Sequence, residues 1–162
     1  MEYVNADTIA LGLSAFRPER AAFTAGRVML QQMRALAKRR ESFAFESTLA
    51  SRSYARWIIE LRRLGYDFHL LFLWLSNADL ALARVKERVR LGGHDVPEEV
   101  IRRRYDKGMK NFFELYQQLA TSWGIYDNST LGESKLIAMG TGKTILSVFD
   151  DRIWHKFSGI KK

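Results

Sequence analysis

Two hydrophobic periodicities alternate along this chain. Short, nearly continuous apolar runs, each followed by polar residues, occupy positions 43–45, 68–75 and 123–126. Longer stretches between them carry apolar side chains at every third or fourth position, as in 22–36 and 54–61. The first pattern predicts buried strands and the second predicts amphipathic helices. Strands that alternate with helices are typical of an α/β fold with a mainly parallel sheet.

The run from Phe68 to Leu75 is the clearest of the predicted strands. It shows no alternation of apolar and polar positions, and strands of this kind are usually covered on both faces of their sheet. We therefore expect both faces of this strand to be buried. A shorter strand is expected to end at Tyr3-Val4, directly before Asp7.

Prolines, glycines and aspartates set the ends of the other elements. Pro18 and Pro97 fit the first turn of a helix, and Gly65 fits a helix end. The helix after Pro97 is expected to continue to about Ala120. A terminal hairpin and a last helix should follow, at Lys135–Met139 with Ile145–Val148 and at Asp150 through Phe157.

Composition narrows the class of function. The 162 residues include 26 Lys and Arg against 18 Asp and Glu, and the net charge of +8 indicates an anionic partner. Cysteine is absent, so disulfides, thiolate nucleophiles and cysteine-bound zinc are excluded, and the three histidines are too scattered to predict a metal site. No apolar run is long enough to span a bilayer, and no signal peptide opens the chain. We expect a cytoplasmic protein with no membrane contact.

Arginines crowd a predicted helical hairpin that spans 83–105. The first arm carries Arg84, Arg88 and Arg90, the turn is Gly92-Gly93, and the second arm carries Arg102, Arg103 and Arg104. Guanidinium groups bind phosphate oxygens two at a time, so such a hairpin can close over a phosphoryl group as a lid. A solvated basic surface of two helices is the alternative. His94 in the turn either touches phosphate or caps the second helix.

Polar residues that follow the predicted strands are the other site candidates, because ligands of parallel sheets bind beyond the carboxyl ends of the strands. Asp7 could accept a proton from a hydroxyl or cap a helix, and Glu46 could bind a hydroxyl or end its strand in solvent. Thr48 and Arg52 could contact a substrate, or serve as a cap and as a surface arginine. The remaining candidates are Ser76 and Asn77 after the second apolar run, and Asp127 and Asn128 after the third.

The segment Gly140–Thr144, GTGKT, superficially suggests a phosphate-binding loop. The motif requires a glycine five positions before Gly142, where Ile137 stands, and a helix afterwards, where Ile145–Val148 reads as a strand. We therefore expect the turn of a hairpin.

Several of these segments together resemble one family. VNAD at Val4–Asp7, FAFEST at Phe43–Thr48, LLFLWL at Leu70–Leu75, RVRLGGHDVPEEVIRRRY in the arginine hairpin and YDNS at Tyr126–Ser129 are similar to segments of the zeta toxin-like P-loop kinases. The resemblance implies a three-layer, nucleotide kinase-like P-loop NTPase fold with a helical arginine lid at 84–104. It implies one domain at 1–157 and a loose tail at 158–162.

The same resemblance implies an ATP-dependent phosphotransferase that uses Mg²⁺ and phosphorylates a hydroxyl of a small molecule such as a sugar nucleotide. Asp7 would orient the acceptor hydroxyl, and Glu46, Thr48 and Arg52 would bind the acceptor. The lid arginines Arg84, Arg88, Arg90 and Arg103 would hold the transferred group, and Asp127 and Asn128 would lie near the nucleotide. An antitoxin-like protein is a possible partner.

The family's first strand, its glycine-rich loop ending in Gly-Lys-Ser/Thr and its first helix have no counterpart here, since only 1–6 precede Asp7. Three explanations are open: a start codon assigned too late, a loop supplied by another chain, or a remnant that no longer binds ATP.

The alternative function is a non-catalytic basic module that binds an acidic protein or nucleic acid, although no interleaving of aromatic and basic residues favours nucleic acid.

Overall fold

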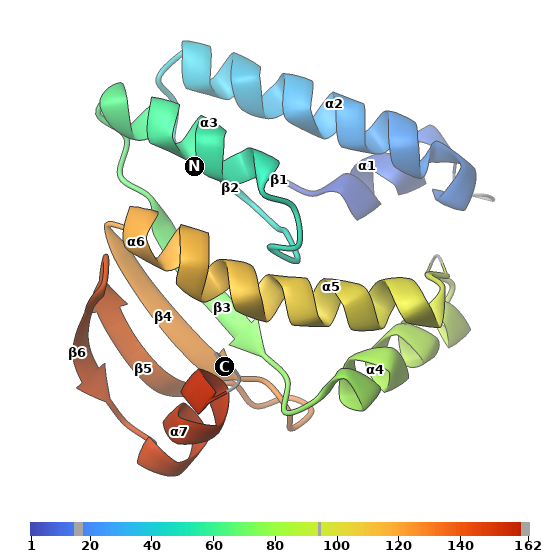
Figure 1. Ribbon diagram of the computed structural model, residues 1–162. Coiled ribbons are helices and arrows are strands. Elements are labelled where there is room, and N and C mark those ends of the chain that lie inside the picture. The colour runs from blue at the N-terminus through green and yellow to red at the C-terminus, as the bar shows by residue number, and fades with distance from the viewer. Residues whose placement is uncertain (15–17, 94, 160–162) are drawn as a thin grey trace. The chain divides into compact units, whose positions relative to one another are not determined.

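The computed structural model describes residues 1–14, 18–93 and 95–159 of the chain. Within these residues it is a mixed α/β structure with two open sheets and no closed barrel. The chain forms two compact units (Figure 1). Unit 1 comprises Met1–Ser47 and Val85–Val96, and unit 2 comprises Thr48–Arg84 and Pro97–Lys162. The assignment of one domain at 1–157 with a lid at 84–104 stays a prediction.

Unit 1 contains a two-stranded parallel sheet and two helices that lie side by side (Figure 1). The elements are β1 (Glu2–Val4), α1 (Ala6–Leu13), α2 (Pro18–Lys38) and β2 (Phe43–Phe45). Small side chains line the contact of α1 with α2, and Ala10, Ala21 and Ala25 are buried there. The predicted apolar side of the second helix is confirmed at Ala25, Met29, Met33 and Leu36.

Helix α1 was not predicted by the sequence, which suggested only a strand end followed by Asp7. The helix is short and contains Gly12 and the β-branched Thr8 and Ile9, all weak helix formers. Its start is fixed by Asn5, whose side chain caps the first turn. Asp7 therefore lies in the first turn of a helix and not in a loop.

Unit 2 contains a four-stranded sheet in the order β3-β4-β5-β6. Strands β3 (His69–Trp74) and β4 (Ser122–Asp127) are parallel, whereas β5 (Lys135–Thr141) and β6 (Thr144–Val148) are antiparallel to their neighbours. The predicted terminal hairpin is thus confirmed. Gly142 lies in its turn with φ of 50°, and its carbonyl accepts a hydrogen bond from Trp123 Nε1 at 2.8 Å. The GTGKT segment is not a phosphate-binding loop.

The helices of unit 2 agree closely with the helix end predicted at Gly65 and the helix starts predicted at Pro97 and Asp150. They are α3 (Ser53–Arg63), α4 (Ala78–Arg90), α5 (Glu98–Asn111), the π-helical segment η1 (Phe112–Tyr116), α6 (Gln117–Leu119) and α7 (Asp151–Gly159), with the last residues of α4 belonging to unit 1. The predicted long helix from Pro97 is α5, η1 and α6 in succession. Because α7 continues to Gly159, the loose tail predicted at 158–162 is wrong for Ser158 and Gly159. Positions 160–162 and His94 lie outside the described residues.

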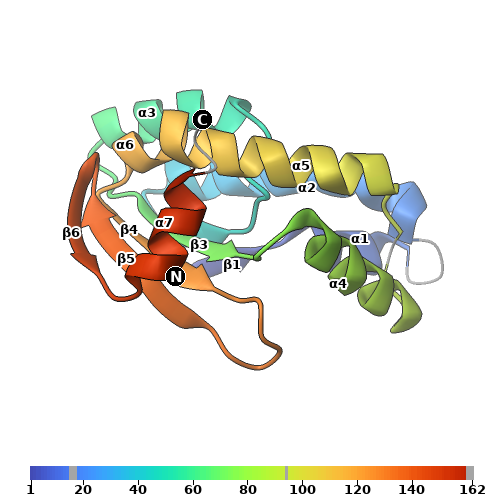
Figure 2. The ribbon, with the colours of Figure 1, turned by 60° about the horizontal axis from the view of Figure 1, so that its bottom comes forward.

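An aromatic cluster forms the core of unit 2. The ring of Phe112 lies 5.1 Å from that of Phe72 and 5.5 Å from that of Phe157, measured between centroids. Helix α7 and the helix that contains η1 therefore pack on the same face of the sheet, to which Leu70 and Trp74 also point (Figure 2). This core supports the strand ends described below.

The expectation that both faces of β3 are buried is wrong within the described residues. Leu71 and Leu73 alternate with the core residues of this strand and are 69% and 58% exposed. Successive side chains of a strand point to opposite faces, and the helices that pack on β3 do so through Phe72. The continuous apolar pattern therefore did not predict the burial of the second face.

Candidate functional site

Polar side chains gather at the carboxyl ends of β1 and β2 in unit 1. We call this group the strand-end cluster, and its members are Tyr3, Asn5, Asp7, Glu46 and Arg88. Asp7, Glu46 and Arg88 were predicted from the sequence as site residues. The chain brings these three together with Tyr3 and Asn5 within one compact unit.

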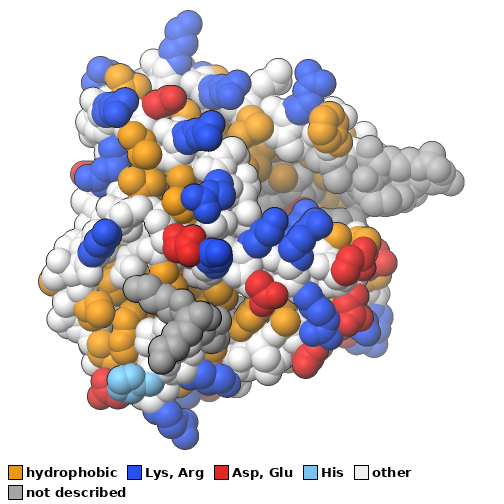
Figure 3. Space-filling view, in the orientation of Figure 1, with side chains coloured by type: hydrophobic (Ala, Val, Ile, Leu, Met, Phe, Trp, Pro, Cys, Tyr) orange, Lys and Arg blue, Asp and Glu red, His pale blue; other side chains and the backbone are white. Residues whose placement is uncertain are grey.

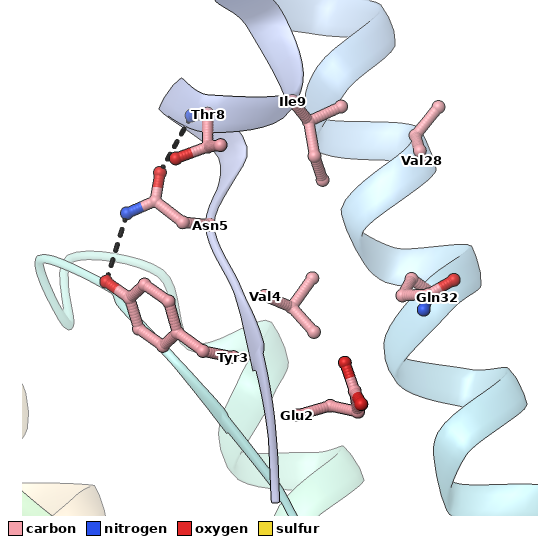
Figure 4. Close-up of a pocket in the computed structure, with 8 residues that line it drawn as sticks. All are labelled: Glu2, Tyr3, Val4, Asn5, Thr8, Ile9, Val28 and Gln32. Atoms are coloured by element: carbon pink, nitrogen blue, oxygen red, sulfur yellow. Dashed lines mark hydrogen bonds between the residues drawn. The ribbon is translucent and has the colours of Figure 1, made fainter. Parts of the chain in front are cut away.

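Asn5 is at the centre of the strand-end cluster. Its Oδ1 accepts hydrogen bonds from the backbone N–H groups of Asp7 at 2.8 Å and Thr8 at 3.0 Å, which caps helix α1. Its Nδ2 donates to Glu46 Oε2 at 2.9 Å and to the Tyr3 hydroxyl at 3.2 Å. Figure 4 shows Asn5 between the Tyr3 ring and the start of α1. One amide therefore links the end of β1, the end of β2 and the helix start.

Tyr3 is electrostatically coupled to Glu46. A hydrogen bond to Glu46 raises the pKa of Tyr3 above its ordinary value, and a hydrogen bond from Asn5 acts in the opposite direction. A neutral phenol next to a carboxylate resists ionisation, because loss of its proton would place two negative charges together. Tyr3 therefore stays a hydrogen-bond donor at neutral pH.

Asp7 and Arg88 form an ion pair between the first turn of α1 and the last turns of α4. Arg88 Nη1 lies 3.5 Å from Asp7 Oδ2, and the two side chains are 45% and 54% exposed. The pair is long and open to solvent, so it contributes little to stability. A carboxylate and a guanidinium held together at a surface can instead bind a hydroxyl and an anion.

A shallow hollow of about 280 Å³ lies beside the strand-end cluster, between β1 and α2. Its lining residues are Glu2, Tyr3, Val4, Asn5, Thr8, Ile9, Val28 and Gln32. In Figure 4 the side chains of Glu2 and Val4 point toward α2, whereas the Tyr3 ring lies on the other side of β1. Asn5 and Tyr3 thus belong both to the hollow and to the cluster.

The end of α4 in unit 1 is formed by Gly92 and Gly93. The N–H of Gly93 donates to the Arg88 carbonyl at 2.9 Å and that of Gly92 to the Val89 carbonyl at 2.9 Å, and φ of Gly92 is 92°. This is a Schellman end, in which a left-handed glycine terminates the helix. A Cβ at position 93 would lie 2.8 Å from Arg88 Cγ. The glycines therefore allow the chain to turn directly beside Arg88.

The carboxyl ends of β3 and β4 in unit 2 also carry polar side chains, and Ser129, Asp127 and Arg84 among them bind the backbone. Ser129 Oγ accepts from the Ser76 N–H at 3.0 Å, and Asp127 Oδ1 accepts from the Ser129 N–H at 2.9 Å. Arg84 Nη2 donates to the carbonyls of Asn128 and Ser129, both at 3.3 Å. The predicted residues Arg84, Asp127 and Asn128 are thus neighbours, and their contacts fold the loop after β4.

The segment that contains Thr48 is held by the long helix of unit 2. Asn111, only 4% exposed, donates from Nδ2 to the Leu49 carbonyl at 2.7 Å, and the Tyr116 hydroxyl donates to the Ser51 carbonyl. A Cβ at Gly108 would overlap the Thr48 carbonyl oxygen. Leu49 has φ of 55°, a conformation that costs about 1 kcal/mol or more for a side chain of this size. The segment is therefore fixed in a strained conformation by buried contacts.

The other predicted site arginines lie in different surroundings. Arg52 is within 3.9 Å of Glu114 in unit 2, and Arg90 is bound by Glu87 of its own helix at 2.8 Å in unit 1. Arg103 is exposed on α5. Its neighbour Arg102, not predicted as a site residue, joins α5 to α4 through Asp79 at 2.6 Å. Of the lid arginines, Arg88 is the one paired with another predicted site residue in unit 1.

Sequence reasoning missed Tyr3, Asn5, Asn111 and Tyr116. A signal existed for Asn5, because asparagine directly before a helix is a preferred cap. No local pattern identified Asn111 or Tyr116, whose partners are 62 and 65 positions away in the chain.

The described residues contain no group of three or more His, Asp or Glu side chains that could hold a metal ion. The sequence contains no G-x-x-x-x-G-K-[ST] segment, and the GTGKT turn is a hairpin. The residues present therefore do not fit a triphosphate cradle of the P-loop type. Among the helices that the structure describes, none is long and apolar enough to cross a bilayer.

Comparison with known proteins gives three results. An uncharacterized protein from Haemophilus influenzae is 29% identical over 102 residues, which covers 63% of this chain and 73% of that protein. No solved structure matches the chain. The family model for zeta toxin matches residues 19–133, a range that includes Glu46, Arg88 and both arms of the arginine hairpin and begins after Asp7. The chain belongs to the zeta toxin family.

Proposed function

We propose that this protein is a phosphotransferase of the zeta toxin type and that the strand-end cluster binds the acceptor, a small hydroxyl-bearing molecule such as a sugar nucleotide. Membership of the family supports a P-loop kinase-like function with ATP and Mg²⁺ as the family's phosphoryl donor. The observation that carries the proposal is the Asp7–Arg88 pair at 3.5 Å, with Glu46 bound in the same cluster. A fold of the three-layer nucleotide-kinase type is part of the proposal.

In this proposal each residue of the strand-end cluster has a definite task. The Asp7 carboxylate accepts a hydrogen bond from the acceptor hydroxyl. With a phosphoryl donor bound, this carboxylate would orient the hydroxyl oxygen and take up its proton. Glu46 accepts a hydrogen bond from a second hydroxyl of the same molecule. The guanidinium of Arg88 faces the negative charge of the transferred group, since phosphoryl transfer depends mainly on positioning and charge neutralisation.

The remaining predicted residues keep more limited roles. Thr48 and Arg52 are proposed acceptor contacts, and Arg84, Arg90 and Arg103 are proposed lid arginines. Asp127 and Asn128 remain predicted nucleotide neighbours. Because the residues present do not fit a triphosphate cradle, no contact with ATP is assigned to them.

The proposal is tested with purified protein at high concentration, Mg-ATP and a panel of sugar nucleotides. Phosphorylated acceptor is detected by mass spectrometry, and acceptor binding is measured separately by calorimetry. We expect acceptor binding, and for Asp7→Asn a loss of phosphoryl transfer of about 100-fold or more with binding largely kept. Lys107→Ala, an exposed change on α5, is the control. Absence of both transfer and acceptor binding would overturn the proposal.

The alternative function is a non-catalytic basic module. The salt dependence of binding distinguishes it from the proposed phosphotransferase. Lys and Arg side chains are scattered among acidic and apolar ones on the face shown in Figure 3. Binding of a nucleic acid would fall by orders of magnitude between low and moderate salt, because it depends on counterion release. Tight, salt-sensitive binding of an oligonucleotide without any acceptor binding would favour the alternative.

A further inference from the structure

Asn5 makes four polar contacts, and the two made by its Nδ2 follow no sequence motif. Through Oδ1 it binds the backbone N–H groups of Asp7 and Thr8, and through Nδ2 it binds Glu46 and Tyr3. The two halves of the amide therefore have separate tasks. The oxygen holds the helix start that carries Asp7, and the nitrogen holds the carboxylate of Glu46.

An amide is well suited to this double task. A serine or aspartate would cap the helix equally well, but neither offers an N–H group to a carboxylate while its oxygen accepts from the backbone. The choice of asparagine therefore points to the Glu46 contact as well as to capping. Asn77 provides a comparison, since its Oδ1 caps α4 through the Leu80 N–H at 2.8 Å and, among the residues that the structure describes, its Nδ2 contacts the Ser76 hydroxyl at 3.4 Å and no carboxylate.

The contacts of Asn5 also fix which groups share the site. The backbone of Asp7 cannot move relative to Glu46 without breaking either the cap of α1 or the Asn5–Glu46 hydrogen bond. Arg88 then contacts Asp7 from α4, and the Tyr3 hydroxyl contacts Asn5 from β1. These are the charged and titratable groups that the structure places around Asn5 within unit 1.

We propose that Asn5 is the positioning residue of the acceptor site, and that it holds Asp7 and Glu46 in one fixed arrangement to receive two hydroxyl groups of a single polyhydroxylated acceptor. This inference rests on the proposed function, because the roles of Asp7 and Glu46 come from it. Asn5 itself touches neither reacting atom. Its effect is exerted through the two carboxylates.

The hydrogen bond from Asn5 to Glu46 is tested without any measurement of activity. Asn5→Asp keeps an oxygen to cap α1 but places a second carboxylate against Glu46. Like charges at this distance raise the pKa of one carboxyl group in the folded state, so the stability they remove is present at low pH and lost as pH rises. We expect the Tm of Asn5→Asp relative to wild type to fall by several degrees between pH 4 and pH 7, that is by roughly 4 °C or more.

Two further variants make this result specific. Asn77→Asp has no carboxylate partner and should show no such pH-dependent loss of Tm relative to wild type. The double variant Asn5→Asp/Glu46→Gln restores a hydrogen bond with donor and acceptor exchanged, and should remove the loss. Identical pH profiles for Asn5→Asp and Asn77→Asp would overturn the assignment of Asn5.

The positioning role is then measured on the acceptor. We expect Asn5→Ala to raise the KM or Kd for the sugar nucleotide by about tenfold, with a smaller change in kcat, because the carboxylates remain but are no longer held together. The double variant Asn5→Asp/Glu46→Gln should recover Tm but not acceptor affinity. Unchanged acceptor affinity in Asn5→Ala would overturn the positioning role.

Failure of the proposed function gives a different pattern. If wild-type protein neither binds nor phosphorylates a sugar nucleotide, the acceptor role falls for the whole cluster. The pH profiles then still decide whether Asn5 holds Glu46 in solution.

Discussion

The two parallel strand pairs of this protein use the polar residues at their carboxyl ends in different ways. At the ends of β1 and β2, Asn5 caps the backbone of α1, but the charged side chains bind other side chains, as in the Asn5–Glu46 and Asp7–Arg88 contacts, and Asp7, Glu46 and Arg88 stay exposed. At the ends of β3 and β4, side chains bind the backbone, as Asp127 and Ser129 do. The first arrangement leaves functional groups available to a ligand, and the second stabilises loops.

This difference implies that substitutions in the two units should have opposite consequences. Backbone groups bound by buried donors lose their partner when the side chain is removed, which costs stability. Exposed side-chain pairs contribute little to stability, so their removal should affect binding and catalysis instead. The predictions below test that division.

The largest loss of stability is expected for Gly108→Ala in α5. The added methyl group would overlap the Thr48 carbonyl oxygen, so the helix and the strained segment at Leu49 must move apart. We expect the free energy of unfolding to fall by about 2–3 kcal/mol, measured by urea denaturation. Gly26→Ala in α2, where a Cβ meets no atom within 4 Å, is the control and should not destabilise. Equal effects of the two would contradict the tight contact.

Asn111→Ala should have the second largest effect. The change removes a buried donor and its hydrogen bond to the Leu49 carbonyl, at a cost of about 1–3 kcal/mol. Thermal unfolding followed by circular dichroism measures this loss. Lys107→Ala on the same helix is the matched surface control. A loss below about 0.5 kcal/mol would mean that the Thr48 segment is not held by α5.

Asp127→Ala should lower the free energy of unfolding by about 1 kcal/mol, because the Ser129 N–H loses its acceptor. Asp127→Asn keeps an acceptor oxygen and should be close to wild type in stability. If Asp127→Asn is stable but loses nucleotide affinity, Asp127 contacts the nucleotide and the two strand pairs are less different than we propose.

The smallest effect on stability is expected for Asp7→Asn, about 0.5 kcal/mol or less, since the ion pair with Arg88 is long and half-exposed. The same variant should show the large loss of phosphoryl transfer described above. A loss of stability greater than that of Asp127→Ala would reverse the comparison between the two units.

The titration of Tyr3 tests the side-chain contacts at the ends of β1 and β2 without any ligand. Its pKa is raised chiefly by Glu46, so the contact stabilises the fold below the ordinary tyrosine pKa and is lost as pH rises through the raised value. The absorbance difference between wild type and Tyr3→Phe should therefore titrate above the ordinary pKa of tyrosine. In a Glu46→Ala background the same difference should titrate at lower pH. An unchanged titration midpoint in the Glu46→Ala background would contradict the coupling of Tyr3 to Glu46.

Much of the fold could be predicted from local pattern. Pro18, Gly65 and Pro97 marked helix ends correctly, because each restricts or permits backbone angles regardless of its surroundings. The apolar runs marked β2, β3 and β4, and the GTGKT segment was correctly read as a hairpin turn. Helix α1 was missed because its weak helix formers are stabilised by the Asn5 cap and by packing on α2.

The candidate site, like the fold, could be predicted from the sequence in part. Asp7, Glu46 and Arg88 could be selected from the sequence because of their residue type, their place after strands and in the arginine hairpin, and the family resemblance. That they share one cluster, joined through Asn5, was decided by the pairing of β1 with β2, which brings together residues some 41 positions apart. The same holds for Asn111 and Tyr116, whose partners are set by packing of the long helix on the Thr48 segment.

The sequence by itself determined the types of most elements and their ends, which depend on residues close together in the chain. It also determined the net charge, the absence of thiols and the family. Only the tertiary structure decided which polar groups are left available to a ligand and which are consumed by the backbone. The physical reason is that a hydrogen bond depends on distance and direction between two groups, and for groups far apart in the chain these are fixed only when the strands pair and the helices pack.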